Sequence, residues 1–423
     1  MTLFEGRRKI NMKLAIVVNS DFAAAVASKY LISDILAHGI DLVLMMPDGP
    51  YAPKLVETGA RHLVVPFRRF PAPLRDLKIC LQLYRAFRSE KPDIVHTMSA
   101  KPNTFGALAA WLAGVPRIVA LTRGLGRGFS KGGGWKGAVL RFVVSRLYRL
   151  AGKVIDRMWF LNGDDLAVFV ERGLVGREQA VLIRSEGIDL QEYSPDNVPP
   201  RALTSLRKEL EIDEATQVVL MAGRVIWSKG VREFVEASRL AAKWRRRVMF
   251  VLVGFHDPDG PDSVPEKYLQ NTSHFTWLGF RPDLVELLAL SDVVTLPSFY
   301  REGFPGILMQ AMAMKKPIVT TDNVGCRDTV DHGKNGFLVP IRDTRAFASA
   351  VETLVNSAQL RATFGTHSFA KARNEFAVEV VNRRVFEDLY GLDYENHGNL
   401  GNEREDKCRN LRSPCSTKAQ DTP

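Results

Sequence analysis

The 423-residue sequence has few cysteines and no long run of uncharged apolar residues. Its four cysteines, Cys80, Cys326, Cys408 and Cys415, form no C-x-x-C pair and no metal-finger spacing. This argues against structural disulfides and zinc fingers and favours a reducing cytoplasmic setting. The longest apolar candidate, residues 104–116, is interrupted by glycine and falls short of the roughly 18 residues that a membrane span needs. The sequence therefore predicts no membrane-spanning helix.

Motifs of several other protein classes are also missing. The apolar run LAIVV that follows the basic residues 7–9 is too short for a signal-peptide core, so we expect no secretion and a loose extension over residues 1–11. The turn NSDFAAA after the first expected strand lacks the G-x-G-x-x-G pattern, which disfavours a dehydrogenase. No RNP-like aromatic motif or basic tail indicates a nucleic-acid partner.

Positive charge is concentrated in the first half of the chain. Residues 1–200 hold 28 Lys and Arg against 18 Asp and Glu, whereas residues 201–423 hold 30 against 29, and together they give the net charge of +11. A positive field of this kind suits an anionic membrane surface or an anionic substrate. The length predicts two domains of about 200 residues each, because single cores rarely grow larger.

Short apolar runs alternate with longer amphipathic segments, such as residues 74–90 and 105–113. This alternation is typical of repeated βα units around a parallel sheet. It restarts after PDNVPP at residues 195–200, the clearest linker, so the sequence predicts two α/β domains. The expected strands are residues 14–18, 42–46, 63–65, 94–96, 118–122 and 158–161 in the first domain, and 218–221, 249–253, 293–296, 318–320 and 337–339 in the second.

Two motifs in the second half predict a ligand site. In YREGFPGILMQAMAM, at residues 300–314, Glu302 leads into a turn that opens a helix, and Gln310 follows eight positions later. The free backbone amides of such a helix start suit a phosphate, while Glu302 and Gln310 can meet hydroxyl groups. In AGRVIWSKG, at residues 222–230, Arg224 and Lys229 follow an expected strand, at the sheet edge where open α/β folds bind ligands. A sugar nucleotide carries both kinds of group.

Together, these segments resemble the retaining glycosyltransferases of family 4, of the bacterial type that builds lipid-linked saccharides. The resemblance implies the GT-B fold, an α/β architecture of two Rossmann-like parallel-sheet domains that face each other across a cleft. It covers roughly residues 13–390, and its further matching segments are VHTMSAKPN at 95–103, TRGLG at 122–126, EGIDLQEYSP at 186–195, and NVGCRDTV and NGFLVP after position 322.

The resemblance also implies a division of the chain. We expect an acceptor-side domain at residues 12–195, a nucleotide-sugar-binding domain at residues 200–375, and a helix at residues 376–395 that crosses back to the first domain. Residues 396–423 have almost no apolar side chains, and we expect this tail to be disordered because it cannot repay the entropy of folding.

The resemblance also implies roles for the residues of this chain that stand at the family's motif positions. In such transferases, fixed positive charge must stabilise the leaving diphosphate, which Arg224 and Lys229 would supply. No carboxylate stands out as a nucleophile, so we expect front-face attack with retention, with no metal and no cofactor. The expected catalytic residues are Glu302, Arg224, Lys229 and His96; the expected nucleotide-sugar contacts are Gly223, Arg224, Lys229, Glu302, Gly303, Phe304, Gly306, Ile307 and Gln310; and the expected acceptor contacts are His96, Lys101 and Asn103.

The chain departs from the family pattern at two positions, where Gln310 replaces a second Glu and Met98 replaces a second His. An amide can accept from one ribose hydroxyl and donate to the other, so nucleotide binding stays possible. Alternatives remain open for single residues. Glu302 also fits a helix-capping carboxylate, and His96 also fits a hydrogen-bonded structural histidine. The acidic segment HDPDGPD at residues 256–262 permits a metal site, although an ordinary polar loop is expected.

Residues 136–153 combine a wide apolar sector with cations at Arg141, Arg149 and Lys153, which suits either an interfacial helix or a core helix with a basic outer face.

We expect a protein peripheral to the cytoplasmic face of the inner membrane. It would transfer a hexose or N-acetylhexosamine from a nucleotide sugar, which we expect to be a UDP-sugar, to a polyprenyl-diphosphate-linked or other cell-surface saccharide, as in lipopolysaccharide or capsule synthesis. Alternatives are a GT-B sugar-nucleotide epimerase or phosphorylase, and a non-catalytic nucleotide-sugar-binding protein that docks on membranes.

Overall fold

The computed structural model describes residues 12–68, 72–125, 134–256, 258, 260 and 262–394. It divides into two compact units, one formed by Met1–Glu186 with Val381–Pro423 and the other by Gly187–Val380. The chain therefore leaves the first unit before the PDNVPP segment, which lies inside the second unit, and returns to the first unit after Val380. Within the described residues, no helix is both long enough and apolar enough to cross a bilayer.

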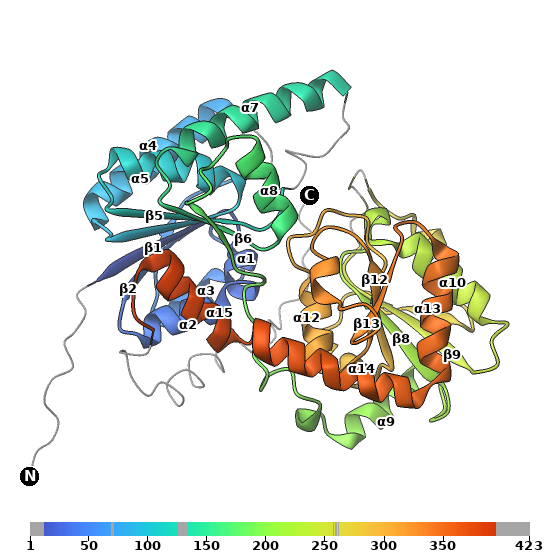
Figure 1. The fold of residues 1–423 in the computed structure, drawn as a ribbon. Helices are drawn as coiled ribbons and strands as arrows, with labels where there is room; N and C mark the ends of the chain where they lie inside the picture. Colours follow the sequence, from blue (N-terminus) through green and yellow to red (C-terminus); the bar gives the residue numbers. More distant parts are fainter. Residues whose placement is uncertain are drawn as a thin grey trace, which may run out of the picture. The chain divides into compact units, whose positions relative to one another are not determined.

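Unit 1 is a parallel sheet in the order β3-β2-β1-β4-β5-β6-β7, covered by helices on both faces (Figure 1). Helices α4, α5, α7 and α8 cover one face, and α2 and α3 cover the other. The strands are β1 (Lys13–Val18), β2 (Asp41–Met46), β3 (Arg61–Val64), β4 (Ile94–Met98), β5 (Arg117–Thr122), β6 (Arg157–Phe160) and β7 (Ala180–Leu182). The α-helices are α1 (Asp21–Val26), α2 (Lys29–Ala37), α3 (Ala52–Glu57), α4 (Pro73–Glu90), α5 (Ala107–Leu112), α7 (Gly134–Gly152) and α8 (Gly163–Glu171), and π-helical turns span Pro102–Gly106 and Val385–Tyr390. Helix α15 (Val378–Arg384) begins in unit 2 and continues into unit 1.

Unit 2 is a second parallel sheet, in the order β10-β9-β8-β11-β12-β13. Helices α10 and α13 pack together on one face of it, whereas α9 packs on α11 and α12 packs on α14 (Figure 1). The strands are β8 (Gln217–Ala222), β9 (Val248–Val253), β10 (Phe275–Trp277), β11 (Val293–Leu296), β12 (Ile318–Thr321) and β13 (Gly336–Val339). The helices are α9 (Pro200–Glu209), α10 (Val231–Ala241), α11 (Leu284–Leu290), α12 (Gly306–Ala313), α13 (Thr344–Asn356) and α14 (Ala358–Lys371), followed by a π-helical turn at Ala372–Phe376.

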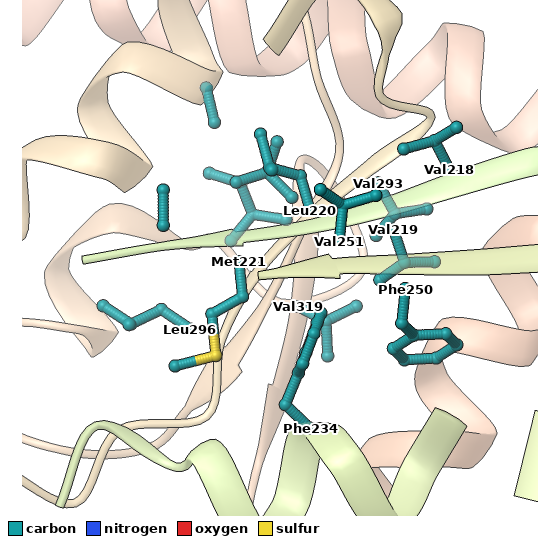
Figure 2. Packing of buried hydrophobic residues seen from close by; sticks show 14 of the residues in the cluster. Val218, Val219, Leu220, Met221, Phe234, Phe250, Val251, Val293, Leu296 and Val319 are labelled. Atoms are coloured by element: carbon teal, nitrogen blue, oxygen red, sulfur yellow. The ribbon is translucent and has the colours of Figure 1, made fainter. Parts of the chain in front are cut away.

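The central strands form because they are largely continuous runs of apolar residues that can be buried on both sides. In unit 2, Val219, Leu220 and Met221 of β8 are fully buried, as are Phe250 of β9 and Phe234 of α10 (Figure 2). The two aromatic rings meet edge to face, with centroids 5.1 Å apart. Parallel strands need this two-sided burial, and each buried side chain of this size contributes about 1.5–3 kcal/mol.

The predicted architecture of two parallel-sheet α/β domains is confirmed. Each expected strand appears within two residues of its predicted bounds, and the segments predicted as helices around residues 74–90 and 105–113 form α4 and α5. The short strands β7 and β10 were not predicted. Each has only three residues, which is too few for a periodic signal. The loose extension expected at residues 1–11 and the disordered tail expected at residues 396–423 lie outside the described residues.

Candidate active site

The predicted nucleotide-binding loops of unit 2 flank the point where the strand order reverses. The chain passes from β8 to β9 on one side, whereas β11 pairs with β8 on the other. Open parallel sheets bind ligands in the crevice outside the carboxyl ends of the strands at such a point. Gly223 and Arg224 directly follow β8, and the loop at residues 297–305 directly follows β11. Both predicted motifs therefore lie at this reversal point.

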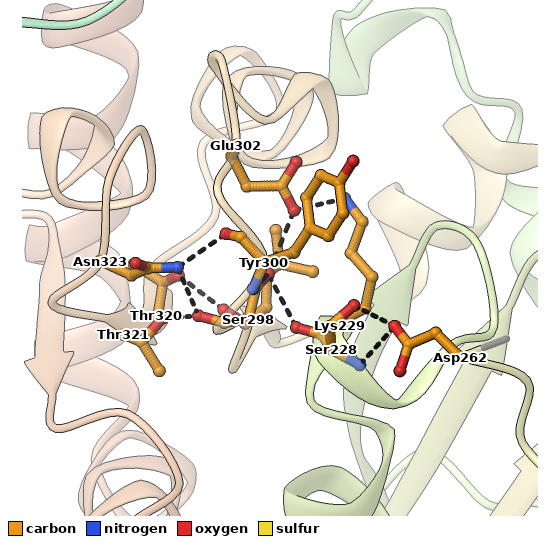
Figure 3. A network of polar contacts seen from close by, with 10 residues as sticks. Ser228, Lys229, Asp262, Ser298, Tyr300, Glu302, Thr320, Thr321 and Asn323 are labelled. Carbon is orange, nitrogen blue, oxygen red and sulfur yellow. Dashed lines mark hydrogen bonds and ion pairs between the residues drawn. The ribbon is translucent and has the colours of Figure 1, made fainter. Parts of the chain in front are cut away.

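Three of the predicted catalytic side chains lie together here. The Nζ atom of Lys229 is 2.5 Å from Oε1 of Glu302, and the two side chains are only 14% and 10% exposed (Figure 3). The exposed Arg224 places its guanidinium carbon 5.5 Å from the ring centroid of Tyr300, and Lys229 Nζ lies 5.9 Å from the same centroid. Two cations thus lie near one aromatic ring at the edge of the sheet, and one of them is paired with the Glu302 carboxylate.

Ser228 joins the two loops through its backbone carbonyl. This oxygen accepts from the amides of Phe299 and Tyr300, each at 2.8 Å, and lies 3.2 Å from Oγ of Ser298. The same Ser298 hydroxyl is 3.1 Å from Oε1 of Glu302 (Figure 3). The turn that carries Lys229 is therefore bonded directly to the loop that carries Glu302, and the ion pair is held from both sides.

Two side chains from other loops support this arrangement. The Asp262 carboxylate accepts from the backbone amide of Ser228 at 3.1 Å and also from its hydroxyl. The Asn323 amide donates to the carbonyl oxygens of Ser298 at 3.2 Å and of Tyr300 at 2.7 Å. The sequence motifs predicted no role for Ser228, Ser298 or Asn323, and they indicated only a polar loop around Asp262. Nothing in their spacing showed that their loops would meet.

Helix α12 begins at the end of the Glu302 loop, with Pro305 as its N-cap. The predicted Gly303, Phe304, Gly306 and Ile307 thus lie in the turn and the first helical residues, where amides have no intrahelical partner. The ring of Phe304 is 4.9 Å from that of Phe376. This contact anchors the turn to the end of the helical segment that follows α14.

Gln310 faces Tyr193 within unit 2. Its Nε2 atom donates to the Tyr193 hydroxyl at 2.8 Å, and burial raises the pKa of that phenol. One of the two N–H groups of the Gln310 amide is thus used inside the unit, and its carbonyl oxygen is suited to accept from a ribose hydroxyl.

The predicted residues of unit 1 have different surroundings. His96 is fully buried in β4, where its Nδ1 atom lies 2.7 Å from the Tyr390 hydroxyl. Asn103 is also fully buried, since its amide donates to the Leu121 carbonyl at 2.8 Å and accepts from Thr97 at 2.9 Å. Lys101 binds Asp76 at 2.7 Å. The Nε2 atom of His96 is buried without a hydrogen-bond partner among the described residues. The predicted roles of His96, Lys101 and Asn103 in catalysis and acceptor binding stay predictions.

The burial of His96 leads to a pH-dependent stability. Burial first, and the charge of Arg123 second, lower the pKa of His96 from 6.5 to about 3. Below pH 6.5 the imidazole binds a proton in the unfolded state but not in the folded state. The contribution of His96 to the free energy of unfolding is therefore fully present above pH 6.5 and is lost as the pH falls towards 3. By about pH 5 the loss is about 2 kcal/mol. We therefore expect the unfolding temperature of His96→Gln to depend less on pH than that of the wild type, between about pH 7.5 and about pH 5.

The exposed His367 provides a matched control for this experiment. The His367→Gln variant should follow the wild-type profile. Equal slopes for wild type and His96→Gln would show that His96 does not carry the effect.

A partly buried ion pair that was not predicted joins the segments that follow β5 and β7 of unit 1. The Arg123 guanidinium donates to both carboxylate oxygens of Glu186 at 2.7 Å, and its Nη2 atom lies 3.4 Å from the sulfur of Met98. Ser28 bonds to both partners of the pair. Glu186 is the last residue of unit 1 before the chain enters unit 2. The position expected to carry a second histidine is therefore the buried Met98, packed against this pair.

Comparisons with known proteins agree with this geometry. Residues 23–156 match the model of the glycosyl transferase 4-like domain, and residues 216–357 match that of glycosyl transferases group 1. The chain is 32% identical to an N,N'-diacetylbacillosaminyl-diphospho-undecaprenol alpha-1,3-N-acetylgalactosaminyltransferase of Campylobacter jejuni, over 76% of this chain and 83% of that protein. It is 28% identical to a UDP-Gal:alpha-D-GlcNAc-diphosphoundecaprenol alpha-1,3-galactosyltransferase of Escherichia coli, over 72% of this chain and 76% of that protein.

Solved structures show the same fold. The Anabaena protein HepE in complex with UDP aligns with a TM-score of 0.73 at 23% identity, over 90% of this chain and 100% of that one. WaaG, a glycosyltransferase involved in lipopolysaccharide biosynthesis, aligns with a TM-score of 0.66 at 16% identity, over 89% of this chain and 100% of that one. The two sheets, both domain matches and the relative from Campylobacter jejuni together show that this chain belongs to the GT-B glycosyltransferases of the bacterial type.

Proposed function

We propose that this chain transfers a hexose or N-acetylhexosamine from a UDP-sugar to a polyprenyl-diphosphate-linked saccharide, with retention and without a metal ion. The observation that carries the proposal is the contact of Lys229 with Glu302, beside Arg224 and in the loop that opens α12. The matched relatives from Campylobacter jejuni and Escherichia coli are transferases whose names specify diphospho-undecaprenol-linked saccharides. HepE binds UDP on the same fold.

The residues of unit 2 suit the departure of a nucleoside diphosphate. As the anomeric bond breaks, negative charge grows on the phosphate oxygens. Arg224 can bind two of these oxygens at once, whereas Lys229 provides a point charge that Glu302 holds in place before the donor binds. The first amides of α12, at Gly306 and Ile307, add donors of fixed direction. Together these groups provide the positive field without a divalent cation.

Retention follows in the proposal from attack on the same face as the leaving group. The departing phosphate accepts the proton of the acceptor hydroxyl, the glycosyl–oxygen bond to the phosphate breaks, and the new glycosidic bond forms on that face. Glu302 and Gln310 hold the donor sugar and the ribose. Lys101 of unit 1 remains the predicted contact for the acceptor. The protein would act on the cytoplasmic face of the inner membrane, where its basic first domain attracts anionic lipid.

An acceptor-dependence assay tests this function. We expect UDP release from a panel of UDP-sugars only when a diphosphate-linked saccharide with a short prenyl chain is present, at an equal rate with and without EDTA. The product linkage should keep the anomeric configuration of the donor, as measured by the proton coupling constant of its anomeric signal. Inversion, or loss of activity in EDTA, would contradict the proposed mechanism.

The same assay separates the alternatives. Conversion of the donor without an acceptor would identify an epimerase or a hydrolase. Sugar phosphate formed from a saccharide and phosphate would identify a phosphorylase. Thermal stabilisation by UDP-sugars without any turnover would indicate a nucleotide-sugar-binding protein.

A further inference from the structure

The outer surface of the helical layer formed by α4, α5 and α7 carries many exposed apolar side chains. The most exposed are Leu74 at 81% and Trp135 at 74%. The whole set, which we name the α4–α5–α7 surface, consists of Leu74, Leu77 and Leu81 on α4, Trp111 and Leu112 on α5, and Trp135, Val139, Phe142, Val143 and Leu150 on α7. These helices are neighbours, because α5 contacts both α4 and α7 on one face of the sheet (Figure 1).

The core of unit 1 does not account for this surface. On α4, the inward side chains Ile79, Leu83 and Phe87 already fill the core, and Leu74, Leu77 and Leu81 form a second apolar stripe on the outside. A helix that covers a sheet needs only one apolar face, with polar residues opposite. Apolar side chains gathered on an outer face indicate an interaction site.

Charge of one sign accompanies the apolar side chains. Residues 94–155 contain ten Lys and Arg and no Asp or Glu. The exposed cations of the layer are Arg75, Lys78, Arg85 and Arg88 on α4, Arg146 and Arg149 on α7, and Lys153 directly after it. The acidic residues of α4 are engaged elsewhere, since Asp76 is buried against Lys101 at 2.7 Å and Glu90 binds Arg61 at 2.8 Å. The surface is therefore apolar and positive.

We propose that the α4–α5–α7 surface docks on an anionic lipid bilayer. Exposed Leu, Trp and Phe side chains can enter the boundary between headgroups and acyl chains, while Lys and Arg meet the lipid phosphates. A second copy of the chain fits less well, because a twofold interface would bring the same positive surfaces together. The proposal deepens the proposed function and rests on it only for its purpose, which is access to a lipid-linked acceptor.

The placement of the apolar side chains also suits this purpose. In right-handed β-α-β crossovers the helices run opposite to the strands, so α4 and α7 begin at the carboxyl edge of the sheet, where ligands bind. Leu74, Leu77, Trp135 and Val139 lie in these first turns, whereas Arg146 and Arg149 lie farther along α7. The bilayer would thus meet unit 1 beside its ligand edge.

Co-sedimentation with vesicles tests the docking surface directly. The full chain should bind vesicles of phosphatidylethanolamine and phosphatidylglycerol, bind phosphatidylcholine vesicles more weakly, and lose affinity as salt is added. The double variant Leu77→Glu and Phe142→Glu should bind phosphatidylglycerol vesicles at least about tenfold more weakly. The control is Val56→Glu with Leu240→Glu, which makes the same charge change at exposed apolar positions on α3 and α10 and should bind like wild type.

The outcomes separate this inference from the proposed function. With a water-soluble acceptor, the Leu77→Glu and Phe142→Glu variant should keep wild-type turnover, whereas transfer to an acceptor embedded in vesicles should fall with its vesicle binding. Wild-type vesicle binding by this variant would overturn the docking surface. So would a change of oligomeric state in light scattering without any lipid binding, which would identify a protein interface. An inactive wild type that still binds vesicles would instead contradict only the proposed function.

Discussion

Replacement of Lys229 by methionine is expected to lower kcat/KM for glycosyl transfer by about 10³-fold. The Lys229 ammonium is 2.5 Å from Oε1 of Glu302, and its side chain is 14% exposed, so its charge acts in a site with little water. Once it is removed, the diphosphate leaves without one of its two fixed cations, and the transition state loses more than the ground state does. Initial rates of acceptor-dependent UDP release measure the effect.

The same substitution also leaves the Glu302 carboxylate without this cation, which is expected to cost about 3 kcal/mol of stability. The double variant Lys229→Met and Glu302→Gln removes both charges and should recover most of that stability while transfer stays lost. This combination separates loss of chemistry from loss of folding. The exposed Lys243 supplies a control, because Lys243→Met should retain full turnover. Wild-type kcat/KM in a folded Lys229→Met protein would contradict the role of Lys229.

Replacement of Gly254 by alanine is expected to lower the stability of unit 2 by more than about 3 kcal/mol and to abolish nucleotide binding. Gly254 directly follows β9 and has φ near +148°, and an added Cβ would lie 1.7 Å from the carbonyl oxygen of Gly223. This neighbour is backbone, and it is fixed because the Gly223 amide donates to the Val253 carbonyl at 2.9 Å. The clash can be relieved only if β8 and β9 separate, which would displace the adjacent Arg224.

Gly279 offers a matched control at the end of the neighbouring strand. It also has a positive φ, of +68°, but an added Cβ would meet nothing within 4 Å. The Gly279→Ala variant should therefore show only the backbone cost of about 1–2 kcal/mol. Thermal unfolding and UDP titration of both variants measure the difference. Equal losses of stability and of UDP affinity in both variants would show that the close approach of Gly254 to Gly223 does not cause the effect of Gly254→Ala.

The fold was largely predictable because its signals are local. The run in β9 is apolar over its whole length, and those in β1 and β8 are apolar after their first residue, as strands buried on both faces must be. The boundary between the units was harder to predict from the sequence, since the units divide after Glu186, ahead of the PDNVPP segment. Proline marks a break in regular structure, but the division between units depends on which side chains the segment contacts, and Glu186 is held in unit 1 by Arg123.

The candidate site was predictable where short motifs contain the reactive side chains themselves. Arg224, Lys229 and Glu302 were expected together, and the structure brings them to one edge. His96 was also expected at the ligand-facing edge, and its role stays a prediction. Its side chain is buried and lies beside Tyr390 of the returning C-terminal segment. Alternation along a strand sends successive side chains to opposite faces, and a single sequence does not show which face a distant helix will cover.

The order of residues alone determined two parallel sheets, a basic first half and the chemical groups that suit a sugar nucleotide, because helical and strand periodicity, net charge and turn residues act over short distances. Tertiary structure decided which groups meet. The carbonyl oxygen of Ser228 joins the Lys229 turn to the Glu302 loop only because β11 lies beside β8. Strand order and helix packing depend on contacts between distant segments, and only those contacts left one face of α4 and α7 apolar, positive and exposed within the described residues.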